Sequence, residues 1–359
     1  MQETALENLK EQILRDHVVS DAPLRGVIED NGNNGIGAIV QALRARAAES
    51  KHGITSLDIG NRVDIRKRFN GSSIIDVLWL NHSIQSLGLR VFVYASATPN
   101  ESDAIKYRDP NKKFTDDADV CDGQLAECIA LTNDVRRLTL SAVGASPRVD
   151  RTLWFVPEAC GRLEHLCLEG FVPTPLFFSG VTLVAALCPL KTLQLSRSVR
   201  RSMQTQHSWA HALDCSAGLA AVVYTVLRAG TVTDLALLDF DVADATPLVN
   251  ALTRWNVPHR DPRVDTPPLL FELERLDLSG SLRGTPNACD VVYAVAQTSL
   301  ARFACNDNPP PPGSTEKLAR SFVYLMRLCE EHGEVMEELG VARTFDGVDD
   351  VKGLMAKYA

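Results

Sequence analysis

Residues 163–171, LEHLCLEGF, place a histidine and a cysteine two positions apart, and these side chain types can act together in nucleophilic catalysis. A thiolate–imidazole pair needs hydrogen-bond contact, and usually a third group that orients the histidine. On one strand face, the Cβ atoms of His165 and Cys167 would be about 6.5 to 7 Å apart. We therefore interpret both as ordinary surface residues and keep a cysteine-dependent enzyme as an alternative.

A second candidate is HSWAHALDC, which places His207, His211 and Cys215 at positions i, i+4 and i+8. On a helix these side chains would share a face, as zinc ligands do, but the sequence specifies no fourth ligand. We expect a helix that packs its histidines against the rest of the chain, with a zinc-dependent enzyme as the alternative. The usual phosphate-binding, serine-hydrolase and metalloprotease motifs do not occur in the sequence. We therefore expect no catalysis, no cofactor and no metal.

Composition narrows the possible partners and compartments. The 359 residues carry 37 Lys and Arg against 45 Asp and Glu, a net charge of −8, which argues against a nucleic-acid partner. The nine cysteines are scattered without a C-x-x-C pair, which predicts buried thiols in a reducing compartment and a cytoplasmic protein. The longest apolar run, LAAVVYTVL, is too short to span a bilayer, so we expect no membrane partner. We also expect a monomer.

A short apolar pattern, L-x-x-L-x-L, recurs along the chain with apolar substitutions. Its eight copies begin at Ile54, Ile84, Val135, Leu163, Leu190, Val232, Leu273 and Leu300. Four of the seven spacings between successive copies lie between 27 and 30 residues. The three longer spacings predict insertions near residues 92–119, 196–214 and 256–270.

Between these copies lie segments with apolar residues at helical spacing. The predicted helices cover residues 35–51, 72–82, 123–133, 175–188, 216–230, 244–255 and 288–297. Amphipathic segments at residues 3–19 and 314–333 predict a helix at each end of the chain. A strand followed by a helix in each unit predicts an α/β protein in which no unit buries its apolar face alone.

This pattern resembles the leucine-rich repeat family, in particular its ribonuclease-inhibitor-like class with long repeats. The resemblance implies a leucine-rich-repeat solenoid, or horseshoe, with a concave parallel β-sheet, convex helices and helical caps. Residues 1–32 would form the N-terminal helical cap, 33–310 an array of about eight units, and 311–359 the C-terminal helical cap. The family's asparagine at the ninth position of the motif is matched only by Asn308. We expect apolar packing, with Phe171 and Phe240 among the replacements, instead of an asparagine ladder.

Strand alternation predicts which residues face outward. The leucines turn inward, so the third and fifth positions of each copy face the concave surface, and the second position adds charges beside them. The predicted partner-binding residues are Arg136, Arg137, Glu164, His165, Lys191, Asp234, Arg275, Asp277 and Arg302. Arg136, Glu164 and Lys191 would form a ladder of alternating charge. Such a ladder is either part of a docking surface or a solvated, self-paired set.

The family resemblance implies that the protein binds another protein through its concave face and has no catalytic activity of its own. The same class includes regulators, which gives an alternative function. The chain would then be a ubiquitin-ligase adaptor, a small-GTPase regulator or a bacterial effector delivered into host cells. A metal- or cysteine-dependent enzyme is the remaining alternative.

Overall fold

A computed structural model describes residues 2–16, 18–19, 21–49, 53–58, 73–93, 117–144, 147–197, 213–253, 273–296, 298, 300–332, 338–342 and 344–345. The chain divides into two compact units, Met1–Val172 and Pro173–Ala359. The ten strands of these units run parallel to the neighbours with which they pair, and they alternate with helices along the chain. The protein is therefore an α/β protein built from successive strand–helix repeats, as the spacing predicts.

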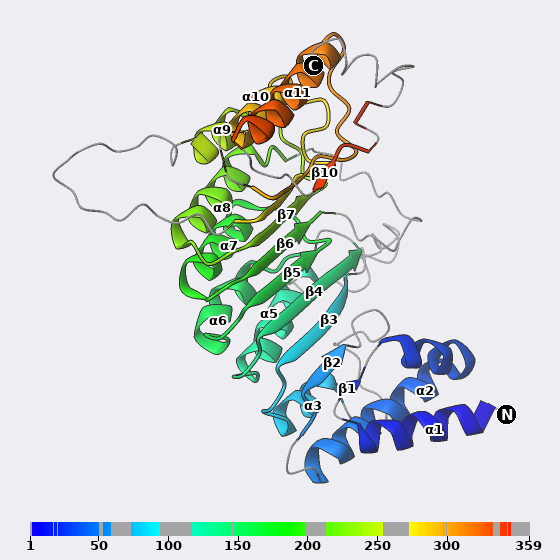
Figure 1. Ribbon diagram of the computed structural model, residues 1–359. Helices are drawn as coiled ribbons and strands as arrows, with labels where there is room; N and C mark the ends of the chain where they lie inside the picture. Colours follow the sequence, from blue (N-terminus) through cyan, green and yellow to red (C-terminus); the bar gives the residue numbers. More distant parts are fainter. Residues whose placement is uncertain are drawn as a thin grey trace, which may run out of the picture. The chain divides into compact units, whose positions relative to one another are not determined.

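The first unit contains five parallel strands that follow one another in chain order (Figure 1). Its elements are α1 (Gln2–Arg15), β1 (Val18–Val19), α2 (Asp21–Glu49), β2 (Ser56–Asp58), α3 (Ile74–Leu80), β3 (Ser86–Val93), α5 (Asp117–Ala130), β4 (Arg137–Gly144), α6 (Asp150–Ala159) and β5 (His165–Glu169). The predicted N-terminal helix is α1, which packs against α2. The predicted boundary at residue 32 falls inside α2, and β1 adds a strand that the motif did not indicate.

The second unit repeats the same plan with five more strands. Its elements are α7 (Pro175–Leu187), β6 (Thr192–Ser196), α8 (Ser216–Ala229), β7 (Asp234–Leu238), α9 (Thr246–Thr253), β8 (Arg275–Asp277), α10 (Ala288–Val295), β9 (Arg302–Ala304), α11 (Thr315–His332) and β10 (Glu338–Gly340). Strand β10 belongs to a ninth copy of the motif, MEELGV at residues 336–341, which we had not predicted. Residues 346–359, the end of the predicted C-terminal cap, lie outside the described residues.

Strand register agrees with the motif in both units. Each of the eight predicted strands begins on the third position of its copy, and these third positions pair with one another wherever a pairing is described. The fourth positions are at most 1 % exposed, among them Leu57, Leu138, Leu166, Leu235 and Leu276. Helices α5 and α6 of the first unit and α7 to α9 of the second lie along one side of the strands (Figure 1), and the leucines of the motif are buried. The predicted alternation of buried and outward-facing residues is confirmed in β5, but it is wrong at the fifth positions Gly88, Ala236, Asp277 and Ala304, which are buried.

The chain leaves several strands through a residue with positive φ. This residue is always two positions after the last apolar residue of the motif, at Gly170, Asp239, Gly280 and Asp307, with φ between 56° and 78°. Glycine adopts this region freely, and aspartate is one of the few other residues that tolerates it. A Gly or Asp at the eighth position of the motif is therefore the sequence signal for this turn after the strand, and our prediction did not include it.

A ladder of side chain to backbone hydrogen bonds joins successive repeats of the second unit. Asn308 accepts a hydrogen bond from the Leu282 N–H at 2.7 Å and donates to the Leu278 carbonyl at 2.9 Å. Ser281 donates to the Leu237 carbonyl at 2.7 Å, and Thr344 donates to the equivalent Cys305 carbonyl. The asparagine match at Asn308 is confirmed, whereas our expectation of apolar packing is wrong at Ser281, because its hydroxyl makes the backbone hydrogen bond that an asparagine amide would make.

Apolar packing does replace the ladder at two other copies. Phe171 and Phe240 occupy the ninth position, and both are at most 3 % exposed. The ring of Phe240 packs against that of Phe178 on α7, with centroids 6.1 Å apart. A polar side chain is not needed at these positions, since large rings fill the space instead.

Candidate functional site

Six of the nine predicted contact residues lie in strands, and Arg136, Glu164 and Lys191 each come directly before one; the nine are divided between the two units. We call Arg136, Arg137, Glu164 and His165, together with their outward neighbours on β3 to β5, the unit-1 face. We call Lys191, Asp234, Arg275, Asp277 and Arg302 the unit-2 face. Register places Arg137 beside His165 in the first set, and Asp234, Arg275 and Arg302 in one row in the second.

Charge pairing on the unit-1 face is partial. The Arg136 guanidinium lies 3.4 Å from the Glu164 carboxylate, and their side chains are 52 % and 23 % exposed. An ion pair this exposed contributes little, about 0 to 1 kcal/mol. The third member of the predicted ladder, Lys191, belongs to the second unit, where its side chain is exposed. The described part of the ladder therefore agrees with the self-paired interpretation.

Pairing on the unit-2 face is more extensive. Arg275 lies between two carboxylates, 3.6 Å from Asp234 and 3.7 Å from Asp277. The second oxygen of Asp277 accepts hydrogen bonds from the Ser279 N–H at 3.0 Å and the Ser279 hydroxyl at 2.5 Å. Asp277 is only 6 % exposed, so it presents little surface to a partner. It holds Arg275 and the start of the following turn in place.

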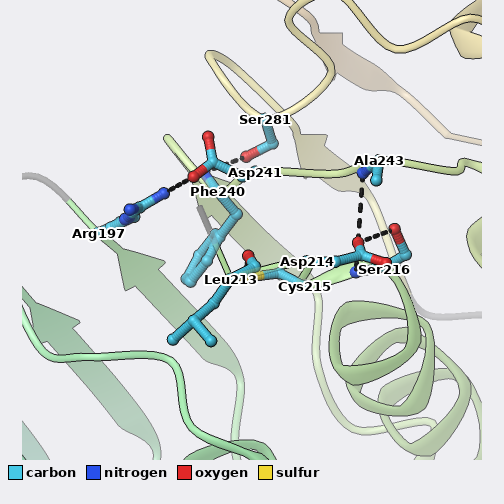
Figure 2. A network of polar contacts seen from close by, with 9 residues as sticks. All are labelled: Arg197, Leu213, Asp214, Cys215, Ser216, Phe240, Asp241, Ala243 and Ser281. Carbon is cyan, nitrogen blue, oxygen red and sulfur yellow. Dashed lines mark hydrogen bonds and ion pairs between the residues drawn. The ribbon is translucent and has the colours of Figure 1, made fainter. Parts of the chain in front are cut away.

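Polar contacts at the end of β6 and before α8 order the rim of the second unit (Figure 2). Arg197 pairs with Asp241, whose carbonyl accepts a hydrogen bond from the Cys215 N–H at 2.8 Å. Asp214 accepts hydrogen bonds from Ser216 and from the Ala243 N–H, and the bonds from the Ser216 hydroxyl and N–H lower the pKa of the Asp214 carboxyl. The network fixes the first turn of α8 against the loop of the next repeat, which is a structural role.

The zinc-site alternative at His207, His211 and Cys215 is not supported where it can be checked. Residues 213–215 are not helical, and Cys215 immediately precedes α8. Cys215 therefore does not continue a helix that starts at His207 and His211, which lie outside the described residues. Among the described residues, no group of three or more His, Cys, Asp and Glu side chains is arranged to hold a metal ion.

No protein-family model and no curated protein matches this sequence. The described part of the chain also contains no helix of the length and apolarity that crossing a membrane requires.

The cysteine–histidine pair shows little sign of activation. Cys167 is half-buried, and its sulfur lies 3.8 Å from the Glu169 carboxylate, on the same strand face as His165. A neighbouring carboxylate disfavours the thiolate that nucleophilic catalysis requires. The arrangement thus resembles a polar surface strand more than a catalytic pair.

The other described cysteines are buried and poorly ionised. Desolvation by burial raises the pKa of Cys128 and Cys305 to about 12, and that of Cys188 and Cys215 to about 11. These thiols behave as small core residues, as the sequence predicts. Together with Cys160 and Cys289, they leave Cys167 as the accessible thiol among the seven cysteines whose side chains the structure describes.

We expect iodoacetamide at pH 8 to alkylate Cys167 at least about tenfold faster than Cys128 or Cys305, because those thiols are both covered and about a thousandfold less ionised than a thiol with a pKa of 9. Peptide mass spectrometry of the native protein over time measures the rates, with Cys167→Ser as the control. Alkylation of Cys128 at the same rate as Cys167 would contradict the burial. A Cys167 rate far above that of glutathione would revive the thiol-enzyme alternative.

Proposed function

We propose that this chain is a leucine-rich-repeat solenoid that binds another protein through the outward face of its strands and has no catalytic activity. The observation that carries the proposal is a group of exposed cations at or just before the starts of strands β4 and β6. Arg136, Arg137 and Lys191 are exposed, whereas the fourth positions of the same strands, Leu138 and Leu193, are buried. An open, regular surface rich in arginine suits recognition of a protein partner.

The chemistry of the face supports binding over catalysis. Its charged groups are exposed or paired with one another, and a metal cluster or an activated nucleophile is not found among the described residues. An excess of eight acidic residues over basic ones disfavours nucleic acid as the partner. A role as an adaptor, regulator or delivered effector would use the same face, and nothing in the described structure favours one of these over the others.

The experiment is affinity capture by the full-length chain, followed by mass spectrometry of the bound proteins. A face variant carries Arg136→Glu, Arg137→Glu, Lys191→Glu and Arg275→Glu. A matched control variant reverses four cations on or beside the helices, with Arg151→Glu, Arg162→Glu, Arg228→Glu and Lys317→Glu. Both variants change the net charge by the same amount, so a general loss of solubility or steering affects them equally.

We expect a saturable partner that binds the wild type and the control variant but is lost, by about tenfold or more, from the face variant. Circular dichroism and thermal unfolding of both variants establish that each is folded. If every partner survives the face variant, or if the control variant loses partners equally, binding does not use the strand face and the proposal fails.

A further inference from the structure

Two tyrosines lie against each other where helices α10 and α11 of the second unit meet. The ring centroids of Tyr293 on α10 and Tyr324 on α11 are 5.3 Å apart, and the ring planes are inclined by 59°. These two helices pack against each other (Figure 1). Tyr324 is 42 % exposed and Tyr293 is half-buried, so the pair lies at the edge of the helix contact and reaches solvent.

This pair offers chemistry that a pair of phenylalanines lacks. Phe177 packs on Phe178, and Phe303 packs on Phe322. All four of these rings are buried, so apolar packing accounts for them. A phenol fills the same space, but it can also give up its hydroxyl proton and an electron from its ring. Two phenols held together at the surface are therefore a site at which one oxidant can act on both rings.

The chemistry of such a pair is oxidative coupling. Each phenol gives one electron to a one-electron oxidant and its hydroxyl proton to water, which leaves a tyrosyl radical. The two radicals form a carbon–carbon bond between ring positions ortho to the oxygens. The hydrogen on each of these carbons then moves through water to the phenol oxygen, which restores both aromatic rings. In total the pair loses two electrons and two protons, the oxidant gains the two electrons, and the product is dityrosine.

The position of the two rings favours coupling within one chain. Coupling requires two radicals to meet, so its rate depends on how closely the two phenols are held. Rings held 5.3 Å apart react as in an intramolecular reaction, without the entropy cost of bringing two molecules together. An exposed side chain such as that of Tyr324 reorients within nanoseconds, so two ortho carbons can approach while the helices keep their packing.

We propose that Tyr293 and Tyr324 are a site of oxidative cross-linking, at which a one-electron oxidant, such as a peroxidase with hydrogen peroxide, converts the pair to dityrosine. The cross-link joins α10 to α11, the first helix of the predicted C-terminal cap. It closes a loop that contains strand β9 and so restricts the unfolded chain. The inference is independent of the proposed function, because the pair lies on helices and not on the strand faces.

The test uses the full-length protein and a one-electron photo-oxidant, tris(bipyridyl)ruthenium with persulfate and visible light. Monomers are separated from cross-linked dimers by denaturing electrophoresis, and dityrosine is followed by its blue fluorescence. Peptide mass spectrometry identifies a linked pair of peptides that contain residues 293 and 324 and are together two hydrogen atoms lighter than the separate peptides. We expect this pair to be the main dityrosine product of the monomer, with a yield per chain that changes by less than about twofold on tenfold dilution, because both phenols belong to one chain.

Phenylalanine variants assign the product to these two residues. Tyr293→Phe and Tyr324→Phe each keep a ring in place and remove one phenol, so each is expected to reduce the dityrosine of the monomer by about tenfold or more. The matched control is Tyr224→Phe, which removes a half-buried phenol from α8 and should change the yield by less than about twofold. Each variant nearly conserves side chain volume, so we expect it to fold normally, which circular dichroism checks.

Three results would overturn the inference. The first is a monomer without the linked peptides under conditions that convert free tyrosine to dityrosine. The second is unchanged dityrosine in the monomer of Tyr293→Phe, since the coupling would then use other tyrosines. The third is dityrosine that forms only in dimers and falls in proportion to dilution, because the reactive phenols would then belong to different chains.

Discussion

Gly218→Ala is expected to destabilise the second unit by about 1 to 3 kcal/mol, although alanine is the better helix former. A Cβ at position 218 of α8 would lie 2.2 to 2.5 Å from three ring atoms of Phe178 on α7. That ring is buried and has Phe177 and Phe240 beside it, with centroids 5.3 and 6.1 Å away, so it has no free direction in which to move. Helix propensity favours alanine by only about 1 kcal/mol, and overpacking of this severity costs more.

Urea unfolding followed by circular dichroism measures the change. The matched control is Gly123→Ala in α5, where the new Cβ would meet only Arg151 at an ordinary 3.7 Å. That change is expected to stabilise the protein by about 0.5 to 1 kcal/mol, since the same gain in helix propensity meets no clash. Adding Phe178→Leu to Gly218→Ala should recover part of the loss, which identifies the ring as its cause. A stabilised Gly218→Ala would mean that α7 and α8 pack less closely than described.

Asp122→Ala is expected to cost about 2 to 4 kcal/mol and to loosen the start of α6. Asp122 is 5 % exposed, and its carboxylate accepts hydrogen bonds from the Arg151 N–H at 2.7 Å, the Thr152 N–H at 2.9 Å and the Thr152 hydroxyl at 2.6 Å. These N–H groups belong to the first turn of α6, which has no intrahelical acceptor for them. Removing the carboxylate leaves buried donors without a partner, which costs more than losing an exposed cap.

Amide hydrogen exchange gives this prediction a local readout. Protection in the first turn of α6 should fall well before that of β4 and β5, while Asp122→Asn, which keeps one acceptor oxygen, should lose less. Glu127→Ala, on the exposed side of the same helix α5, should change stability by less than about 0.5 kcal/mol. Uniform loss of protection across the unit, with no preference for α6, would show that Asp122 does not act as this helix's cap.

The strands could be predicted from the sequence because their signal is local and repeated. Leu163, Leu166 and Leu168 define one strand by their spacing alone, and every other copy then fixes the same register. The outward positions follow from that register, which is why Arg137 and Arg275 were placed correctly on the faces. The family name does not follow from the same observations and stays a proposal.

Features that depend on neighbouring repeats could not be predicted. Helix α6 was missed because Pro157 interrupts its pattern, and the helix is held instead by Asp122 from the preceding repeat. Ser281 did not match an asparagine motif, yet its hydroxyl reaches the Leu237 carbonyl of the repeat before it. Burial of Asp277 depends on Arg275 and Ser279 folding over it, which residue type does not reveal. The pattern within one repeat therefore predicts its strand and most helices. The helix caps and the hydrogen-bond ladder join neighbouring repeats, so they become visible only in the stacked structure.

The shared register of the strands has a consequence for how the sequence can change during evolution. Because β2 to β10 each begin on the third position of a copy, substitutions at the exposed positions of these strands change the surface, while the apolar residues at the fourth positions keep their neighbours. Surface chemistry and stability therefore depend on different positions of the same short motif. Single replacements at these exposed positions therefore alter the surface chemistry of the chain and leave its core as it was.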